Sequence, residues 1–241
     1  MTGTVLITGG AARIGRYIAI ALAEDGWTVI IHYNRSEAKA VALAEDIKKA
    51  GNTAFTVGAN LAVPSERDTL IERASALTNG PITALINNAS TFDNDHAKSF
   101  SREEYDHHMD INLYAALSLS RDFARQLPKE QAGSIINMID QRVYAPTPDY
   151  FTYAISKSAL FAATKTMAQS YAPDIRVNGI GPGPTIQNKA QTPEEFETER
   201  LSTLLGDGSP PETIVDGVRY LLNARAVTGQ MIAIDGGQHL I

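Results

Sequence analysis

The sequence predicts an α/β fold in which helices cover both faces of one doubly wound parallel sheet. Apolar runs alternate with amphipathic stretches along the whole chain, and most of these runs are continuous series of Val, Ile and Leu. Strands that are buried on both faces have this composition, and strand–helix alternation implies right-handed crossovers between parallel strands. The length of 241 residues suits a single domain, residues 1–241, with about seven strands.

Each expected element is bounded by a change in this pattern. The expected strands are, in order, Val5–Thr8, Thr28–Tyr33, Thr53–Val57, Ala84–Asn87, Ser134–Ile139, Ile175–Ile180 and Met231–Ile234. The amphipathic stretches between them predict helices at Ile14–Asp25, Ser36–Ala50, Ser65–Leu77, Arg102–Gln126, Tyr153–Ala172 and Glu212–Leu222. Gly26, Gly51 and the pair Gly80-Pro81 stand where the first three helices should end.

The least regular part of the chain lies between residues 181 and 211, which include five prolines together with Gly206 and Gly208. We interpret about 184–211 as a mobile flap over a binding site, with an ordinary long surface loop as the alternative. The four glutamates between Glu194 and Glu199 are typical of a solvated helix face.

Composition narrows the class of partner. The net charge is −6, with 21 basic and 27 acidic residues, which argues against nucleic acid or an acidic membrane as the main partner. Because the chain has no cysteine, disulfides, zinc–thiolate sites and a cysteine nucleophile are excluded. The first strand begins too early for a signal peptide, and no apolar run is long enough to span a membrane. We therefore expect a cytoplasmic protein.

The three histidines His96, His107 and His108 lack partners at metal-ligand spacing, so we interpret them as surface residues and expect no metal site.

A glycine-rich turn joins the first strand to the first helix, with the sequence Thr8-Gly9-Gly10-Ala11-Ala12-Arg13-Ile14-Gly15. Glycines permit close approach of a phosphate to backbone N–H groups, and the helix N-terminus adds partial positive charge. The spacing is not Gly-x-Gly-x-x-Gly, so an ordinary strand–helix turn remains open on this motif alone.

The end of the second strand predicts which nicotinamide cofactor would bind. It reads His32-Tyr33-Asn34-Arg35-Ser36, without the acidic residue that would bind the ribose hydroxyls of NAD. Arg35 and Ser36 can bind a 2′-phosphate, and Arg13 can reach the same region, so we expect NADPH. The alternative is that Arg35 is a surface charge and that Ser36 only caps the second helix.

Tyr153 and Lys157 lie one helical turn apart on the same face of an expected helix. A lysine in that position favours the phenolate and should lower the pKa of the tyrosine. One such pair can arise by chance, but it follows other motifs in a fixed order. These are the glycine turn, Asn87-Asn88-Ala89-Ser90, Asn112 and, later, Gly181-Pro182-Gly183, Val227-Thr228-Gly229 and Asp235-Gly236-Gly237.

This order resembles the short-chain dehydrogenase/reductase family over essentially the whole chain. The resemblance implies a Rossmann-type fold and assembly as a homo-oligomer, often a tetramer. The family's catalytic set of Asn, Ser, Tyr and Lys maps to Asn112, Tyr153 and Lys157, but the serine position holds Asp140. A carboxylate there would repel the developing alkoxide of a ketone substrate, whereas it can relay a proton to a ring nitrogen through Tyr153.

The chain resembles the pteridine reductase branch of this family at Asp140, at the arginine of the first turn and at the run Asn88-Ala89-Ser90-Thr91-Phe92. Its C-terminal residues 235–240 resemble those of bacterial dihydromonapterin/dihydrofolate reductases. The resemblance implies that Arg13 and Ser90 contact both cofactor and pterin, and that Phe92 stacks the pterin against the nicotinamide. Asp140 and Tyr153 complete the expected substrate site.

The cofactor site implied by the motifs and the resemblance consists of Gly9, Arg13, Ile14, Gly15, Tyr33, Asn34, Arg35, Ser36, Asn60, Leu61, Asn88, Ala89, Ser90, Tyr153, Lys157, Pro182, Gly183 and Thr185. Two positions depart from the family pattern. Asn60 stands where an adenine-contacting Asp is usual, and Pro184 shifts the phosphate-side hydroxyl to Thr185.

The resulting hypothesis is an NADPH-dependent reductase of pterins, including dihydrofolate-like compounds, in which Tyr153 donates the proton and Asn112 links Lys157 to solvent. The alternatives are a carbonyl or ketoacyl reductase and a catalytically silent NADP-binding regulator. Structural roles also remain open for Phe92 as a core aromatic, Asp140 as a buried acid and Asn112 at a helix break. His239, near the C-terminus, has no assigned role, with a place in a pocket or at a subunit contact as the alternative.

Overall fold

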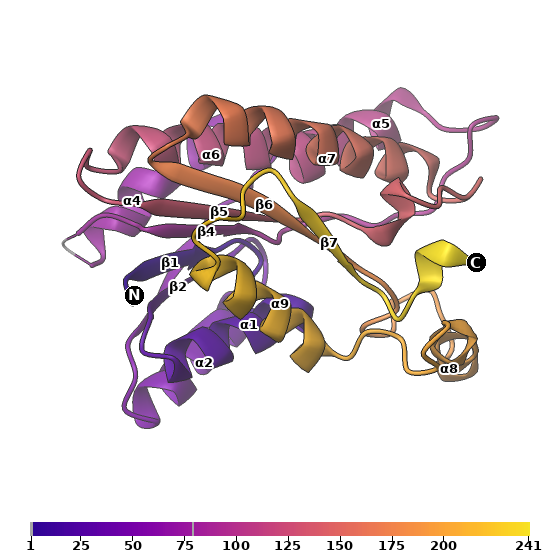
Figure 1. Ribbon diagram of the computed structural model, residues 1–241, viewed down its shortest axis with the longest axis horizontal. Coiled ribbons are helices and arrows are strands. Elements are labelled where there is room, and N and C mark those ends of the chain that lie inside the picture. The colour runs from indigo at the N-terminus through magenta and orange to yellow at the C-terminus, as the bar shows by residue number, and fades with distance from the viewer. Residues whose placement is uncertain (1, 79) are drawn as a thin grey trace.

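The computed structural model describes residues 2–78 and 80–241, in which seven parallel strands form one sheet (Figure 1). The strand order is β3-β2-β1-β4-β5-β6-β7, so the direction of winding reverses between β1 and β4. The crevice at such a switch point, at the carboxyl ends of the strands, is where ligands bind in this type of sheet. The strands are β1 (Thr4–Ile7), β2 (Thr28–Tyr33), β3 (Ala54–Gly58), β4 (Ala84–Asn87), β5 (Gly133–Met138), β6 (Ile175–Pro182) and β7 (Met231–Ile234).

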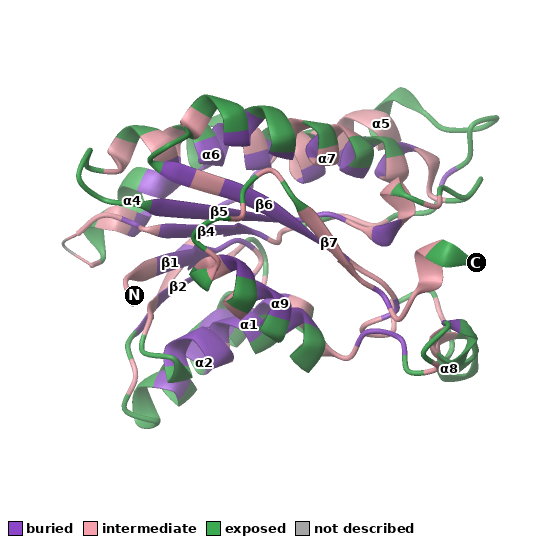
Figure 2. Ribbon diagram, in the orientation of Figure 1, coloured by how far each residue is buried: buried purple, intermediate pink, exposed green. Residues whose placement is uncertain are grey.

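Helices cover both faces of the sheet, with α1, α2 and α9 on one side and α4, α6 and α7 on the other (Figure 1). The helices are α1 (Arg13–Glu24), α2 (Glu37–Lys49), α3 (Pro64–Arg67), α4 (Leu70–Ala76), α5 (Arg102–His108), α6 (Ala115–Gln126), α7 (Phe151–Tyr171), α8 (Pro193–Ser202) and α9 (Pro211–Asn223). Each face has its own apolar core, and the central strands are buried between them (Figure 2). The predicted fold class is confirmed.

Two expected helices are interrupted. The stretch 102–126 contains a π-helical segment, Met109–Tyr114, between α5 and α6. The stretch 65–77 is divided at Thr69, whose hydroxyl bonds to the carbonyls of Ser65 and Glu66 and so competes with the helical backbone pattern. Among the described residues, no helix has both the length and the apolar character needed to cross a membrane.

Candidate active site

A cavity of about 890 Å³ opens at the carboxyl ends of the strands. Every residue predicted to bind cofactor or substrate lines it, and of the predicted catalytic residues only Asn112 does not. Sequence reasoning assigned no cofactor or substrate role to several other lining side chains, most of which lie outside the motifs, although His32 belongs to the run at the end of the second strand. They are His32, His107, Ile111, Gln141, Arg142, Tyr150, Phe196, Glu199 and Gln238.

The glycine turn is packed tightly against the end of β4. Gly9 has a φ of +62°, and a Cβ on Gly15 would lie 2.5 Å from the Gly9 carbonyl oxygen and 2.7 Å from Nδ2 of Asn88. The Asn88 amide in turn donates to the Thr8 carbonyl at 2.8 Å. Only glycine fits both positions without displacing the turn, so the tight turn expected between β1 and α1 is present, and its binding of a pyrophosphate stays a prediction.

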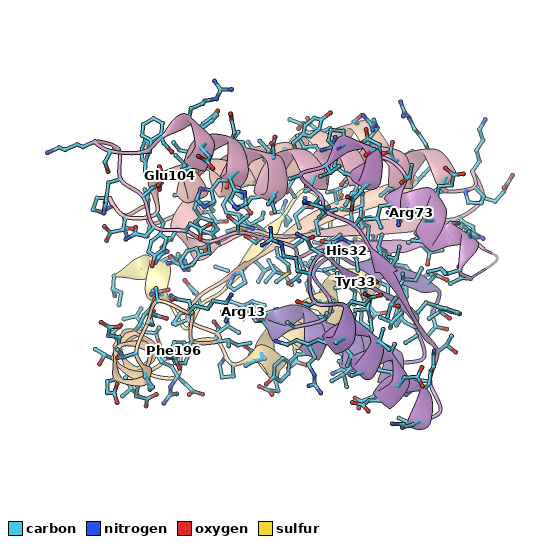
Figure 3. The ribbon with its side chains drawn as sticks, turned by 180° about the vertical axis from the view of Figure 1, so that it is seen from behind. Arg13, His32, Tyr33, Arg73, Glu104 and Phe196 are labelled. Carbon is cyan, nitrogen blue, oxygen red and sulfur yellow. The ribbon has the colours of Figure 1, made fainter. Side chains whose placement is uncertain are left out.

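His32, which the sequence analysis left without a role, supports this turn from β2 (Figure 3). Its Nδ1 accepts a hydrogen bond from the Gly9 N–H at 3.0 Å, and its Nε2 lies 3.0 Å from the Ala59 carbonyl. The ring must therefore carry its proton on Nε2. Burial lowers the pKa of His32 to about 4, so the ring stays neutral and holds the turn at ordinary pH.

The end of β2 lacks a free acid, as predicted. The first carboxylate, Glu37, accepts a hydrogen bond from the Tyr33 hydroxyl at 3.0 Å. The Ser36 side chain makes no capping bond to α2, although it stands at the N-cap position. Arg35 is exposed at the cavity and makes no hydrogen bond or ion pair to any described residue. Both side chains are therefore available to a phosphate, and the geometry does not support the capping alternative for Ser36.

Arg13 contacts the flap. It has a φ of +52°, and its two terminal nitrogens donate to the carbonyls of Gln187 at 2.8 Å and Ile186 at 2.9 Å (Figure 3). Two carbonyls of the flap hold its guanidinium in this structure, and the expectation that it reaches the phosphate region beside Arg35 stays a prediction. Arg13 still lines the cavity and joins the turn to the flap.

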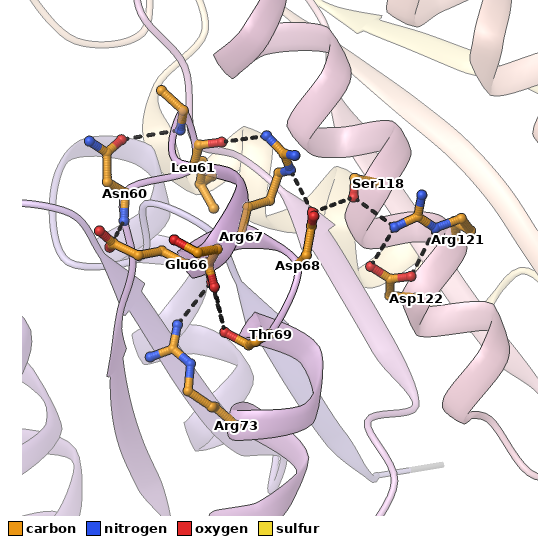
Figure 4. Close-up of polar contacts among 12 residues, drawn as sticks. Asn60, Leu61, Glu66, Arg67, Asp68, Thr69, Arg73, Ser118, Arg121 and Asp122 are labelled. Atoms are coloured by element: carbon orange, nitrogen blue, oxygen red, sulfur yellow. Dashed lines mark hydrogen bonds and ion pairs between the residues drawn. The ribbon is translucent and has the colours of Figure 1, made fainter.

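The loop after β3 is held by polar contacts that Figure 4 shows. The Asn60 side-chain oxygen accepts a hydrogen bond from the Ala62 N–H at 3.1 Å. The backbone N–H of Asn60 donates to the Glu66 carboxylate at 2.6 Å. The buried Arg67 donates to the Leu61 carbonyl at 3.3 Å. The side-chain oxygen of Asn60 is thus engaged within its own loop, and its NH₂ group is the part that can face an adenine.

Tyr153 and Lys157 lie on α7 beside the segment that follows β5. The Tyr153 hydroxyl donates to Oδ2 of Asp140 at 2.7 Å, and the Arg142 backbone N–H donates to Oδ1 at 2.8 Å. Nζ of Lys157 donates to the Met138 carbonyl at 2.8 Å. Tyr153 is 5% exposed and Lys157 is 2% exposed. The Asp140 carboxyl, the Tyr153 phenol and the Lys157 amine thus lie close together, with Tyr153 and Lys157 buried and Asp140 half-buried.

Burial is the main cause of the pKa shifts in this group. It raises the pKa of the Asp140 carboxyl, against the lowering effect of the hydrogen bonds from Arg142 and Tyr153. It also raises the pKa of Tyr153 well above the usual value of 10, and the neighbouring Asp140 raises it further. Burial lowers the pKa of Lys157 from 10.5 to about 8. The expectation that Lys157 lowers the pKa of Tyr153 is therefore wrong for this structure, because burial and the adjacent carboxyl dominate.

Asn112 lies in the π-helical segment, 1% exposed. Its side-chain oxygen accepts from the Thr91 N–H at 2.8 Å and the Ser90 hydroxyl at 3.1 Å. Its NH₂ group donates to the Thr91 carbonyl at 3.0 Å and the Ser156 hydroxyl at 3.1 Å. These contacts tie the end of β4 to α7. A direct bond to Lys157 is not among them, so a link through water stays a prediction.

Phe92 faces the catalytic group. Its ring is stacked on Tyr150 with centroids 4.1 Å apart and meets Tyr153 edge-on at 4.7 Å. Phe92 lines the cavity and does not belong to the buried apolar cores. The core-aromatic alternative is therefore not supported.

The flap contains helix α8 and closes over one end of the cavity. Glu199 accepts hydrogen bonds from Gln191 at 2.6 Å and from Gln238 near the C-terminus at 3.2 Å. The expectation of a wholly solvated glutamate face is therefore wrong for Glu199. Nearby, the Thr185 hydroxyl donates to the Gly183 carbonyl at 3.0 Å and lies 2.9 Å from the Ser209 hydroxyl.

Two further histidines are placed by their contacts. His108 is fully buried, so its assignment as a surface residue is wrong: its Nδ1 lies 2.7 Å from the Thr152 hydroxyl, which bonds to Asp95. α5 packs against α7 at this point, which no local pattern shows. His239 Nδ1 pairs with Asp235 at 2.6 Å and does not line the cavity. No three metal-ligand side chains cluster anywhere in residues 2–78 or 80–241.

A sequence model described as short chain dehydrogenase matches residues 3–197. This chain belongs to the short-chain dehydrogenase family. The matched range includes the glycine turn, Asn112, Asp140, Tyr153 and Lys157, and the predicted resemblance is thereby confirmed.

Among curated relatives of this short-chain dehydrogenase, the 3-oxoacyl-[acyl-carrier-protein] reductase FabG of Staphylococcus aureus strain Mu50 is 29% identical over 245 residues. The alignment covers 100% of this chain and 99% of the relative. Among solved structures, FolM alternative dihydrofolate reductase 1 from Brucella canis, complexed with NADP, is 42% identical with a TM-score of 0.95, covering 99% of this chain and 94% of that one. The angucycline C-6 ketoreductase LanV with bound NADP is 32% identical with a TM-score of 0.92, covering 99% and 96%. Both solved structures contain NADP, in agreement with the predicted cofactor.

Proposed function

We propose that this short-chain dehydrogenase is an NADPH-dependent reductase of pterins, including dihydrofolate-like compounds. The observation that carries the proposal is the hydrogen bond between the Tyr153 hydroxyl and the half-buried Asp140 carboxyl. In a ketone reductase the same place needs a neutral hydroxyl donor, whereas a ring nitrogen needs a proton. The likeness to FolM, at 42% identity, supports the same substrate class.

The cofactor site fits NADPH. The turn at Gly9 would offer backbone N–H groups to the pyrophosphate, and Arg35 and Ser36, which line the same cavity, would bind the 2′-phosphate. When bound, NADPH supplies the hydride to a ring carbon.

The chain's own residues handle the proton. Tyr153 keeps its proton because its pKa is raised, and it donates that proton to the adjacent ring nitrogen. Asp140, whose pKa is also raised, can return a proton to the phenol through their shared hydrogen bond. The Lys157 amine, fixed by the Met138 carbonyl, places positive charge beside the site.

A carbonyl or ketoacyl reductase is the second candidate, because FabG is similar over the whole chain. A protonated Asp140 could donate a hydrogen bond to a ketone oxygen in place of serine. A silent NADP-binding regulator is less well supported, because the Tyr153–Asp140 bond and the buried Lys157 would then have no purpose. The predicted tetramer and cytoplasmic location stay predictions.

The deciding experiment measures kcat/KM for NADPH oxidation with dihydrobiopterin, dihydrofolate and a β-ketoester side by side. We expect the wild-type enzyme to prefer the pterins. Asp140→Ser should lower pterin turnover by about 10²- to 10⁴-fold, the usual scale of general acid catalysis. Asp110→Ser, at an exposed acid, is the matched control. Faster reduction of the ketoester by the wild type, improved further by Asp140→Ser, would show a carbonyl reductase instead.

A further inference from the structure

Arg142 lines the cavity near the Asp140 carboxyl, whose charge acts on it, but its guanidinium forms no ion pair with that carboxyl or with any other described residue. It lies in a short 3₁₀ helix, Gln141–Val143, two residues after Asp140. Its backbone N–H bonds to Asp140, but its guanidinium makes no hydrogen bond or ion pair within residues 2–78 and 80–241. Its Nε is buried without an acceptor. A buried donor without a partner is rare in folded proteins, so this guanidinium has hydrogen-bonding capacity that the described chain leaves unused.

The guanidinium is held by aromatic rings. Its central carbon lies 4.9 Å from the centroid of Tyr150 and 5.4 Å from that of Phe92. Tyr150 is itself fixed, because its backbone has a φ of +56° and its N–H donates to the Asn94 side chain at 3.1 Å. An arginine that rests on aromatic rings keeps its N–H groups available in the guanidinium plane, where they suit a carboxylate bidentately.

The neighbouring Asp140 carboxyl acts on this cation through its charge but does not form an ion pair with the guanidinium. Both oxygens of Asp140 are occupied, one by Tyr153 and one by the backbone of Arg142. The other cavity arginine near the flap, Arg13, is already paired with two carbonyls. Arg142 therefore offers a positive charge beside the aromatic pair Phe92–Tyr150, within the same cavity as Tyr153.

We propose that Arg142 forms an anion subsite that binds a carboxylate on the substrate's tail, so that the enzyme favours pterins with a carboxylated tail over pterins with a neutral one. The inference rests on the proposed function, in which the pterin ring lies in the cavity beside Phe92 and Tyr153. A tail leaving the ring over the aromatic pair meets the guanidinium. Arg142 is thus a specificity residue, and Asp140 and Tyr153 do the proton transfer.

The test compares dihydrofolate, which has a carboxylated tail, with dihydrobiopterin, which has a neutral one. Arg142→Gln should lower the ratio of their kcat/KM values by about 10-fold or more, mainly through a higher KM for dihydrofolate. Arg142→Lys should keep part of the preference. Any effect of the lost charge on Asp140 acts on both substrates and cancels in the ratio. Lys165→Gln, at an exposed cation that lies over the Phe161 ring outside the cavity, is the control. An unchanged ratio would overturn the proposal.

A binding measurement separates this inference from the proposed function. NADP-loaded protein is titrated calorimetrically with 4-aminobenzoylglutamate and with the uncharged 4-aminobenzamide. We expect wild type to bind the anion about 10-fold more tightly than Arg142→Gln does, with no such difference for the amide. This result would support the subsite even if neither pterin were reduced, in which case only the proposed function would fail. Equal binding of the anion by both proteins would overturn the subsite.

Discussion

The bond between Asp140 and Tyr153 is the residue-scale feature on which the chemistry depends. A phenol beside a carboxylate in water would have its pKa changed little, but both groups here are buried, and both pKa values are raised. Because both pKa values are raised, each group holds its proton to a higher pH than it would in water, and we propose that Tyr153 passes one to a basic ring nitrogen. The two groups titrate as a pair, so a pH profile of turnover reports both together.

Tyr153→Phe tests the proton donor at this scale. The change removes the hydroxyl but keeps the ring that meets Phe92 edge-on. We expect kcat for pterin reduction to fall by at least about 10²-fold, while the Kd for NADPH changes little. Tyr220→Phe, on the exposed face of α9, should leave both values unchanged. Near-normal turnover of Tyr153→Phe would show that another group donates the proton.

At the scale of elements, two interruptions of regular structure shape the site. The π-helical segment Met109–Tyr114 turns Asn112 toward Thr91 and Ser156, and so joins the loop after β4 to α7. Such π segments are frequent at functional sites. The second feature is the flap, an irregular stretch that contains the helix α8. This helix brings Glu199 to the C-terminal segment, where Glu199 accepts a hydrogen bond from Gln238.

Glu199→Ala should loosen the flap without unfolding the protein. The change removes the acceptor for Gln191 and Gln238, and hydrogen bonds to a charged group are worth roughly 1.5–3 kcal/mol. We expect tryptic cleavage after Lys189 to become about 10-fold faster, because local opening precedes cleavage, while the melting temperature stays nearly constant. Mass spectrometry of the fragments identifies the cut. Glu194→Ala, on the exposed side of α8, serves as the control. An unchanged cleavage rate in Glu199→Ala would show that the hydrogen bonds of Glu199 do not hold the flap.

At the scale of the whole molecule, the fold tolerates buried ionisable groups at the carboxyl ends of its strands. The two apolar cores lie on the faces of the sheet, so the polar cluster at its end does not interrupt them. Lys157 in particular is 2% exposed and has its pKa lowered from 10.5 to about 8 by burial. The folded protein therefore bears a free-energy cost for keeping this amine charged.

Lys157→Met should stabilise the protein while inactivating it. The unfolded chain binds the lysine proton up to about pH 10.5 and the folded chain only up to about pH 8, so the cost is fully present below pH 8 and disappears as the pH rises toward 10.5. At pH 7 we expect the variant's free energy of unfolding to exceed the wild-type value by roughly 1–3 kcal/mol, allowing for the lost bond to Met138.

Urea denaturation at pH 7 and pH 10, without added nucleotide, measures the difference. Lys129→Met, at an exposed position, should show no gain at either pH. A Lys157→Met variant that is less stable than wild type at pH 7 would contradict the assigned burial cost.

The sequence by itself determined the features that depend on neighbours along the chain. Continuous apolar runs identified every strand, and the helix spacing placed Tyr153 and Lys157 on one face. The glycine turn and the missing acid at the end of β2 predicted a place for phosphates. The structure contains the tight turn, and it has no free acid at the end of β2. The order of motifs was enough to recognise the family, since each motif stands at the end of a strand or on a helix that the pattern had already located.

Only the tertiary structure decided which distant groups meet. Arg13 pairs with carbonyls more than 170 residues away, and His108 is buried because α5 packs against α7. Tyr150 is stacked on Phe92 because its backbone takes a left-handed conformation that Asn94 holds. The lowered pKa of Lys157 and the raised pKa of Tyr153 likewise come from burial. Contacts and dielectric environments of this kind arise between segments far apart in sequence, so no local periodicity or propensity contains them.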